Sequence, residues 1–206
     1  MSVKREFVVF ARKATTAPDF PLNDLPGKGG RMDLVARCIC NALWISHDLR
    51  RDTRIHIIAY GRPNPPLCIT FDGSTLRRVS PDERNIASWI RKALKAESGR
   101  KANPGITVQK RGFQELVKEL EAEGKFFYVM HERGRSIDDV EIHENPVFIL
   151  GDHIGLPKKE ESFVERFPHE KLSLGNISYL TSQCITIIHY ILDKKLRRPP
   201  PPAALS

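Results

Sequence analysis

The sequence predicts a single α/β domain with a mostly parallel sheet flanked by helices. Three observations support this fold class. Runs of β-branched and aromatic residues alternate with amphipathic segments, no repeat or shift in composition divides the chain, and 206 residues suffice for one full core, or for two small ones. Hydrophobic residues make up 40% and charged residues 28%, which is typical of a globular protein.

The amino-terminal part begins with a strand and a long loop. Arg5–Arg12 is a short run of β-branched and aromatic residues, as strands have. The next segment is rich in Pro, Gly and Asp, and long loops of this kind usually serve function. A helix is predicted from Arg31, because apolar residues then recur at helical spacing, at Met32, Val35, Ala36, Ile39 and Leu43.

Two strands and a helix follow. The strands are Thr53–Gly61 and Leu67–Phe71, and a proline-rich turn separates them. Ser80 is expected to cap the helix, with Pro81 at its first position and acidic residues behind. The apolar face of this helix is expected at Ile86, Trp89, Ile90, Ala93 and Leu94.

The carboxyl-terminal part predicts further strands and helices in alternation. They are a helix at Gly112–Glu123, a strand at Lys125–Glu132, a polar excursion at Arg133–Glu144, a strand at Pro146–Leu150, a helix at Lys158–Phe167 and a short strand that ends at Gly175. A last helix begins near Ser178. Its buried face is expected at Leu180, Cys184, Ile187, Ile188 and Ile191.

Charge and composition limit the possible functions. The chain has 33 basic and 25 acidic residues, a net charge of +8, and a basic surface attracts polyanions, most often RNA or DNA. No apolar run approaches the ~20 residues of a membrane span, and no signal peptide is recognisable, so a cytoplasmic protein without membrane contact is expected. Neither the 4 cysteines nor the histidines have metal-binding or disulfide spacing, and no metal is expected.

Two loops near the carboxyl end predict a ligand site. Pro146–Leu150 runs into Gly151-Asp-His-Ile-Gly155, and the next strand ends at Gly175. If both strands are parallel, their loops meet at the edge of the sheet where ligands bind. No GxGxxG motif is present, and the segment Gly27-Lys-Gly-Gly-Arg31 lacks the spacing of a phosphate-binding P-loop.

Several segments resemble a known family. "FILGDHIGLP" and "LSLGNISYLTSQCITIIHYILD" resemble the carboxyl-terminal cofactor knot of the SPOUT RNA methyltransferases. "LNDLPGKGGRMDLVARC", "ALWISHDLRRDTRIH" and "SPDERNIASWIRKAL" are similar to the archaeal tRNA pseudouridine-54 N1-methyltransferases of that superfamily. The resemblance extends through Leu196. It divides the chain into one SPOUT domain at 1–196 and a proline-rich tail at 197–206 that we expect to be disordered.

The resemblance implies a homodimeric enzyme that uses S-adenosylmethionine (SAM) to methylate N1 of pseudouridine at position 54 in the tRNA T-loop. It also implies a deep trefoil knot within about 126–196. The cofactor contacts that it implies are Met130, Gly151, Leu174, Gly175, Leu180 and Cys184, with Asp152 and His153 in the same loop. Cys184 is expected to shape the pocket rather than to act as a nucleophile.

Nitrogen methylation needs a group that accepts the N1 proton and a cation for developing charge. The candidates are Asp24 and Arg31, with Asp33 competing with Asp24. Arg12, Arg50, Arg51 and Arg54 are candidate contacts to tRNA. Each of these residues could also be a helix cap or a surface charge. Two alternatives stay open: a SPOUT enzyme for ribosomal RNA, and a non-catalytic RNA-binding module.

Overall fold

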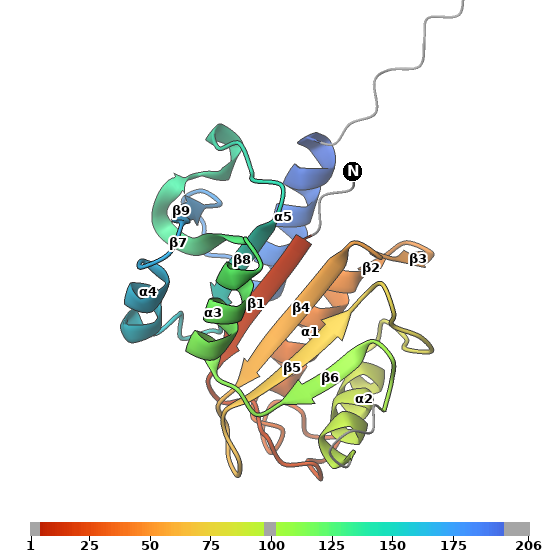
Figure 1. The fold of residues 1–206 in the computed structure, drawn as a ribbon. Coiled ribbons are helices and arrows are strands. Elements are labelled where there is room, and N and C mark those ends of the chain that lie inside the picture. The colour runs from red at the N-terminus through yellow and green to blue at the C-terminus, as the bar shows by residue number, and fades with distance from the viewer. Residues whose placement is uncertain (1–4, 97–101, 196–206) are drawn as a thin grey trace, which may run out of the picture.

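The computed structural model describes residues 5–96 and 102–195. Its centre is a seven-stranded sheet in the order β6-β5-β4-β1-β8-β7-β9 (Figure 1). The parallel strands are β4 (Thr53–Ala59), β1 (Arg5–Ala11), β8 (Pro146–Gly151), β7 (Phe126–Ser136) and β9 (His169–Ser173). The strands β5 (Leu67–Asp72) and β6 (Ile106–Gln109) continue the sheet in antiparallel pairing. The predicted mixed α/β domain with a mostly parallel sheet is therefore confirmed.

Helices cover both faces of the sheet, and β1 shows why. Its side chains alternate between two cores: Phe7 and Val9 belong to one, and Val8 and Phe10 to the other. The first core includes α1 (Met32–Leu43), α2 (Glu83–Lys95) and α5 (Thr181–Lys195). The second includes α3 (Phe113–Ala122) and the short α4 (Lys158–Val164).

Some predicted boundaries were wrong. Helix α2 is capped by Asp82 rather than Ser80, because the Asp82 carboxylate accepts hydrogen bonds from the backbone N–H groups of Arg84 and Asn85. The strand β6 and the small hairpin β2 (Trp44–Ile45) and β3 (Asp48–Leu49) were not predicted. These strands have two to four residues, too few to show an alternating pattern.

The last helix also differs from its prediction. It begins at Thr181, so Leu180 precedes the first turn and is 61% exposed, while Cys184 and Ile187 are half-buried. The buried face of α5 is made by Thr181, Ser182, Ile185, Ile188, His189, Ile191 and Leu192. The hydroxyl of Thr181 donates to the carbonyl of Gly151 at 2.8 Å, which turns this polar position toward the sheet. The tail at 197–206 lies outside the described residues.

Strand β7 runs into the segment predicted as a polar excursion. Met130 and Arg135 are both register partners of Leu172 in β9, so residues 131–134 form an outward bulge. A side chain at Gly134 would clash with the backbone of Lys171 and Leu172, so the bulge packs tightly on β9. Within the described ranges, no helix is both long and apolar enough to cross a bilayer.

Candidate functional site

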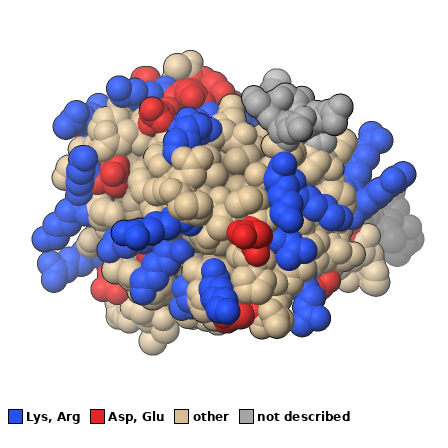
Figure 2. Space-filling view, turned by 90° about the horizontal axis from the view of Figure 1, so that it is seen from below, with Lys and Arg blue, Asp and Glu red and all other residues tan. Residues whose placement is uncertain are grey.

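The bulge of β7 and the loops after β8 and β9 enclose a cavity of about 580 Å³. It lies at the carboxyl ends of parallel strands, where open α/β sheets bind their ligands. Its volume falls within the ~300–1,000 Å³ that is usual for small-molecule sites. The carboxyl ends of these strands face downward in Figure 1. Figure 2 views the molecule from below, and this face carries more Lys and Arg than Asp and Glu.

Most of the predicted cofactor contacts meet in this cavity. Its lining includes Met130, Gly151, Asp152, Leu174, Gly175 and Cys184. The other two predicted contacts, His153 and Leu180, are exposed and do not line it. Leu180 immediately precedes the first residue of α5, Thr181, and His153 lies in the loop after β8.

Asp152 organises the loop after β8. Its buried carboxylate accepts the backbone N–H of Arg12 at 2.9 Å and that of Ile154 at 2.9 Å, and its carbonyl accepts the N–H of Gly155 at 2.9 Å. A side chain at Gly151 would clash with the backbone of Gly155 and Leu156. Therefore the loop folds back on its own strand and leaves its backbone as one wall of the cavity.

Another wall of the cavity comes from the loop after β9. Gly175 has φ +107°, a conformation that L-residues rarely adopt, and its N–H donates to Ser173 Oγ at 3.1 Å. Apart from the glycine and its two chain neighbours, no atom of residues 5–96 or 102–195 lies within 4 Å of the place where a Cβ at Gly175 would project. Burial raises the pKa of the Cys184 thiol, which keeps its sulfur neutral and suits a residue that shapes the wall.

The bulge of β7 supplies a wall that the sequence did not indicate. His131, Glu132 and Arg133 line the cavity, and Glu132 accepts a hydrogen bond from the hydroxyl of Ser178 at 2.8 Å. This contact joins the bulge to the loop that precedes α5. The sequence predicted His131 and Glu132 as the end of a strand and Arg133 as the start of a polar excursion, and only the pairing with β9 shows that the strand continues beyond them.

The two predicted catalytic residues lie in the loop before α1, and neither lines the cavity. The Asp24 carboxylate accepts the N–H groups of Gly27 at 3.1 Å and Lys28 at 2.9 Å, so it closes a turn. The Arg31 guanidinium binds both carboxylate oxygens of Asp33, at 3.0 and 3.2 Å. Burial raises the pKa of Asp33, but hydrogen bonds from Arg31 and Arg37 outweigh it and lower that pKa.

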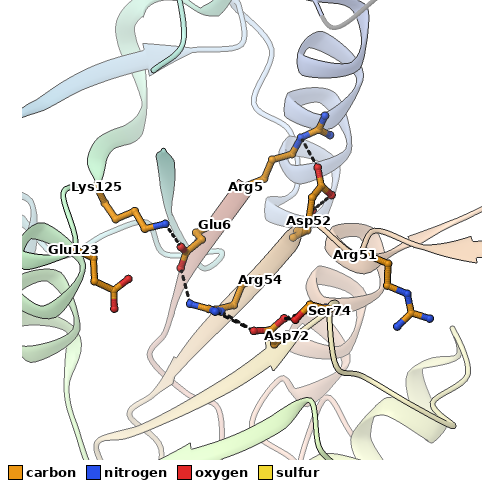
Figure 3. Close-up of a pocket in the computed structure, with 10 residues that line it drawn as sticks. Arg5, Glu6, Arg51, Asp52, Arg54, Asp72, Ser74, Glu123 and Lys125 are labelled. Carbon is orange, nitrogen blue, oxygen red and sulfur yellow. Dashed lines mark hydrogen bonds and ion pairs between the residues drawn. The ribbon is translucent and has the colours of Figure 1, made fainter. Parts of the chain in front are cut away.

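The predicted RNA-contacting arginines lie at opposite edges of the sheet. Arg12 follows β1 beside the cavity, and its Nη2 lies 3.4 Å from the carbonyl of Gly155. Arg50, Arg51 and Arg54 lie at the amino ends of the parallel strands. Arg51 and Arg54 line a second cavity there, of about 500 Å³ (Figure 3).

Protein groups already engage these three arginines. Arg50 pairs with Asp193 at 2.6 Å, and Arg54 reaches Asp72 at 2.9 Å and Glu6 at 3.6 Å (Figure 3). Arg51 donates to two backbone carbonyls. The four candidate RNA contacts therefore do not lie on one surface, and their ion-pair partners distant in sequence cannot be seen in a charge count.

Comparison with known proteins identifies the family. A family model described as SAM-dependent RNA methyltransferase matches residues 4–196. A tRNA (pseudouridine(54)-N(1))-methyltransferase of Methanocaldococcus jannaschii is 48% identical over 200 residues, covering 93% of this chain and 97% of the relative. The protein of the same name from Methanococcus maripaludis is 42% identical over 195 residues, covering 92% and 98%.

Solved structures share the fold at low identity. Archaeoglobus fulgidus Nep1 bound to S-adenosylhomocysteine has a TM-score of 0.56 and 16% identity, over 80% of this chain and 71% of that one. A Legionella pneumophila methyltransferase in complex with SAM has a TM-score of 0.50 and 14% identity, over 94% and 67%. The chain belongs to the family of SAM-dependent RNA methyltransferases, and within it to the archaeal tRNA (pseudouridine(54)-N(1))-methyltransferases.

Proposed function

We propose that this chain methylates N1 of pseudouridine 54 in the T-loop of tRNA, with SAM as the methyl donor and N1-methylpseudouridine as the product. The observation that carries this proposal is the 48% identity to a relative of that name along almost the full length of both chains. The cavity at the carboxyl edge of the sheet supports the cofactor assignment. It combines backbone walls at Gly151 and Gly175 with apolar contacts from Met130 and Leu174.

The residues that line the cavity fit SAM. When bound, the cofactor supplies an electrophilic methyl group on a positively charged sulfur. The Gly151–Gly155 loop and the Leu174–Gly175 turn would hold the adenine ring and the polar groups of SAM against backbone groups. Glu132 brings a carboxylate to the same cavity and would favour a cationic ligand.

The chemistry on the RNA side follows from the structure of pseudouridine. Its glycosidic bond is at C5, so N1 keeps a hydrogen and becomes nucleophilic when that proton is removed. Alignment of N1 with the methyl carbon supplies much of the acceleration. The base must leave its stack to reach the cavity. We assign proton acceptance to Asp24 and charge stabilisation to Arg31, which would approach the base from the loop before α1.

We also infer a homodimer with a knotted cofactor domain. Large apolar side chains are exposed at Ile177, Tyr179 and Leu180 beside the cavity and at Tyr190 on α5. Such exposure is typical of a surface that a partner covers. The knot is expected at about 126–196, where the order β8-β7-β9 in space differs from the order along the chain.

A paired methylation assay tests the activity. Purified protein, labelled SAM and a T-arm RNA with pseudouridine at position 54 are expected to give methylated product, and the same RNA with uridine to give none. Equal labelling of both RNAs would contradict the specificity. Ribosomal RNA as acceptor tests the alternative target, and calorimetry with SAM tests the non-catalytic alternative, which predicts no binding.

A further inference from the structure

Four cations in the loops after β1, after β4 and before α1 are not used in ion pairs with the described residues. Arg12, Lys13, Lys28 and Arg62, here called the basic strip, form no ion pair with any residue of 5–96 or 102–195. Lys13, Lys28 and Arg62 are exposed, and Arg12 is half-buried. By contrast, Arg37, Arg50 and Arg54 each bind a carboxylate. No carboxylate of the described residues occupies the basic strip, so its cations are available to an external partner.

The order of the strands places the basic strip beside the cavity. β4, β1 and β8 are neighbours and parallel, so their carboxyl ends follow one another along one edge. Arg62 follows β4, Arg12 and Lys13 follow β1, and β8 ends at the cavity wall. Neighbouring strands are about 4.8 Å apart, so adjacent positions along this edge are within reach of long side chains.

Hydrogen bonds to backbone carbonyls and close packing at a glycine hold the three loops of the basic strip together. Thr16 Oγ1 donates to the carbonyl of Gly61 at 2.9 Å, and Thr15 Oγ1 donates to that of Arg62 at 3.1 Å. The loop that carries Lys28 joins them through Gly30, where a side chain would clash with the carbonyl of Lys13. The glycines around Lys28 thus serve close packing, which explains their presence without a P-loop.

Arg12 connects the basic strip to the cavity. Its backbone N–H binds the carboxylate of Asp152, and its guanidinium contacts the carbonyl of Gly155 at 3.4 Å. Asp152 and Gly155 both line the cavity. A ligand that touches Arg12 therefore lies at the cavity rim, and one that continues to Lys13 and Arg62 crosses the ends of β1 and β4.

We propose that the basic strip binds consecutive phosphates of the substrate RNA and so places the target base over the cavity. Cations without carboxylate partners on neighbouring loops are the complement of a phosphate backbone, which fixes register without reading sequence. The basic face in Figure 2 agrees with this orientation. This inference rests on one part of the proposed function, namely that the substrate is RNA.

The test compares two variants with the same change in charge. Lys13→Gln with Arg62→Gln removes two cations of the basic strip. Arg77→Gln with Arg78→Gln removes two exposed arginines that follow β5 at the opposite edge of the sheet. Binding of a fluorescent T-arm RNA is measured by anisotropy over a series of salt concentrations, with S-adenosylhomocysteine present so that no methyl transfer occurs.

The basic-strip variant is expected to bind RNA about tenfold or more weakly, and its plot of log affinity against log salt to lose roughly one unit of slope per substitution. The affinity for S-adenosylhomocysteine should stay unchanged, and the control variant should match the wild type. An unchanged affinity and slope, or an equal loss in the control, would overturn the inference. Because this assay measures binding alone, a failed methylation of pseudouridine leaves its result intact.

Discussion

The carboxylate of Glu6 lies 3.1 Å from Nε2 of His56, and both side chains are 4% exposed. Lys125 binds the other oxygen of Glu6, and Arg54 Nη1 lies 3.6 Å away (Figure 3). Burial raises the pKa of Glu6, but the hydrogen bonds and charges of His56 and Lys125 outweigh it and lower that pKa to about 2. One buried carboxylate thus holds three basic side chains at the amino edge of the sheet.

This network predicts an acid-sensitive contribution to stability. Below the ordinary carboxyl pKa of 4.5 the unfolded chain takes up a proton at Glu6, whereas the folded chain does not until about 2. The stabilisation is therefore complete above pH 4.5 and is lost as the pH falls from 4.5 to about 2. Glu6→Gln is expected to lower the free energy of unfolding by about 3–5 kcal/mol at pH 7, because Lys125 then stays buried without its partner.

Urea unfolding at pH 7 and pH 3 measures this contribution. The difference in the free energy of unfolding between wild type and Glu6→Gln should be smaller at pH 3 than at pH 7. Glu144→Gln is the control, because Glu144 is exposed and forms no ion pair with the described residues. An equal difference in the free energy of unfolding at pH 7 and pH 3 would show that the charge of Glu6 does not stabilise the fold.

A valine at Gly175 is expected to block SAM binding while the fold is kept. The strain of a side chain at φ +107° should cost about 1–2 kcal/mol, and the new side chain would project where the cavity wall is open. Gly124→Val is a matched control, since Gly124 also has a left-handed φ of +75° and open space at its Cβ but lies outside the cavity.

Calorimetry with SAM and thermal unfolding separate the two effects. Both valine variants should lose similar stability, and only Gly175→Val should lose affinity, by about tenfold or more, which is 1.4 kcal/mol or more of binding free energy. Normal affinity in Gly175→Val would remove the turn after β9 from the cofactor site.

Asp24→Asn tests the proposed proton acceptor. A carboxamide keeps one oxygen for the turn at Gly27 and Lys28 but cannot take up the N1 proton. Turnover is expected to fall by roughly 10²-fold or more, with little change in the affinity for SAM. Asp19→Asn, an exposed position in the same loop, is the control. Turnover equal to that of the control would leave Asp24 with its role in the turn alone.

Leu180→Asp tests the inferred homodimer. A carboxylate at this exposed apolar position would be costly to bury against a second copy, so the dimer is expected to dissociate at micromolar concentration. Ile45→Asp, on the β2–β3 hairpin, is the control because Ile45 is also an exposed apolar residue, at 45%. Sedimentation velocity gives the result. A variant that sediments as the wild type does would place the interface elsewhere.

The predictable parts of the fold are those in which one residue pattern decides the structure. Phe7 to Phe10 and Val147 to Leu150 are buried on both faces, so their apolar runs identify strands without ambiguity. The site formed by the glycine-containing loops after β8 and β9 is predictable for the same reason, because each loop directly follows a strand that its sequence pattern identifies. Leu180 shows the limit, because an apolar residue just before a helix fits the helical period and yet lies outside.

The charged residues of the site were harder to assign. Arg12 and Arg50 are equivalent in a count of charges, but Arg50 is bound to Asp193, which is 143 positions away. Glu132 and Arg133 reach the cavity only because β7 resumes its pairing with β9 beyond them. Such properties depend on tertiary pairing, which local sequence does not encode.

The bulge of β7 separates the residues that pair with β9 from the residues that line the cavity. Leu172 pairs with Met130 before it and with Arg135 after it, so both ends are fixed. Three of the residues between them face the cavity, and Gly134 alone is held by close packing. Substitutions at His131, Glu132 and Arg133 therefore alter the lining of the cofactor cavity while the paired residues on either side preserve the strand register.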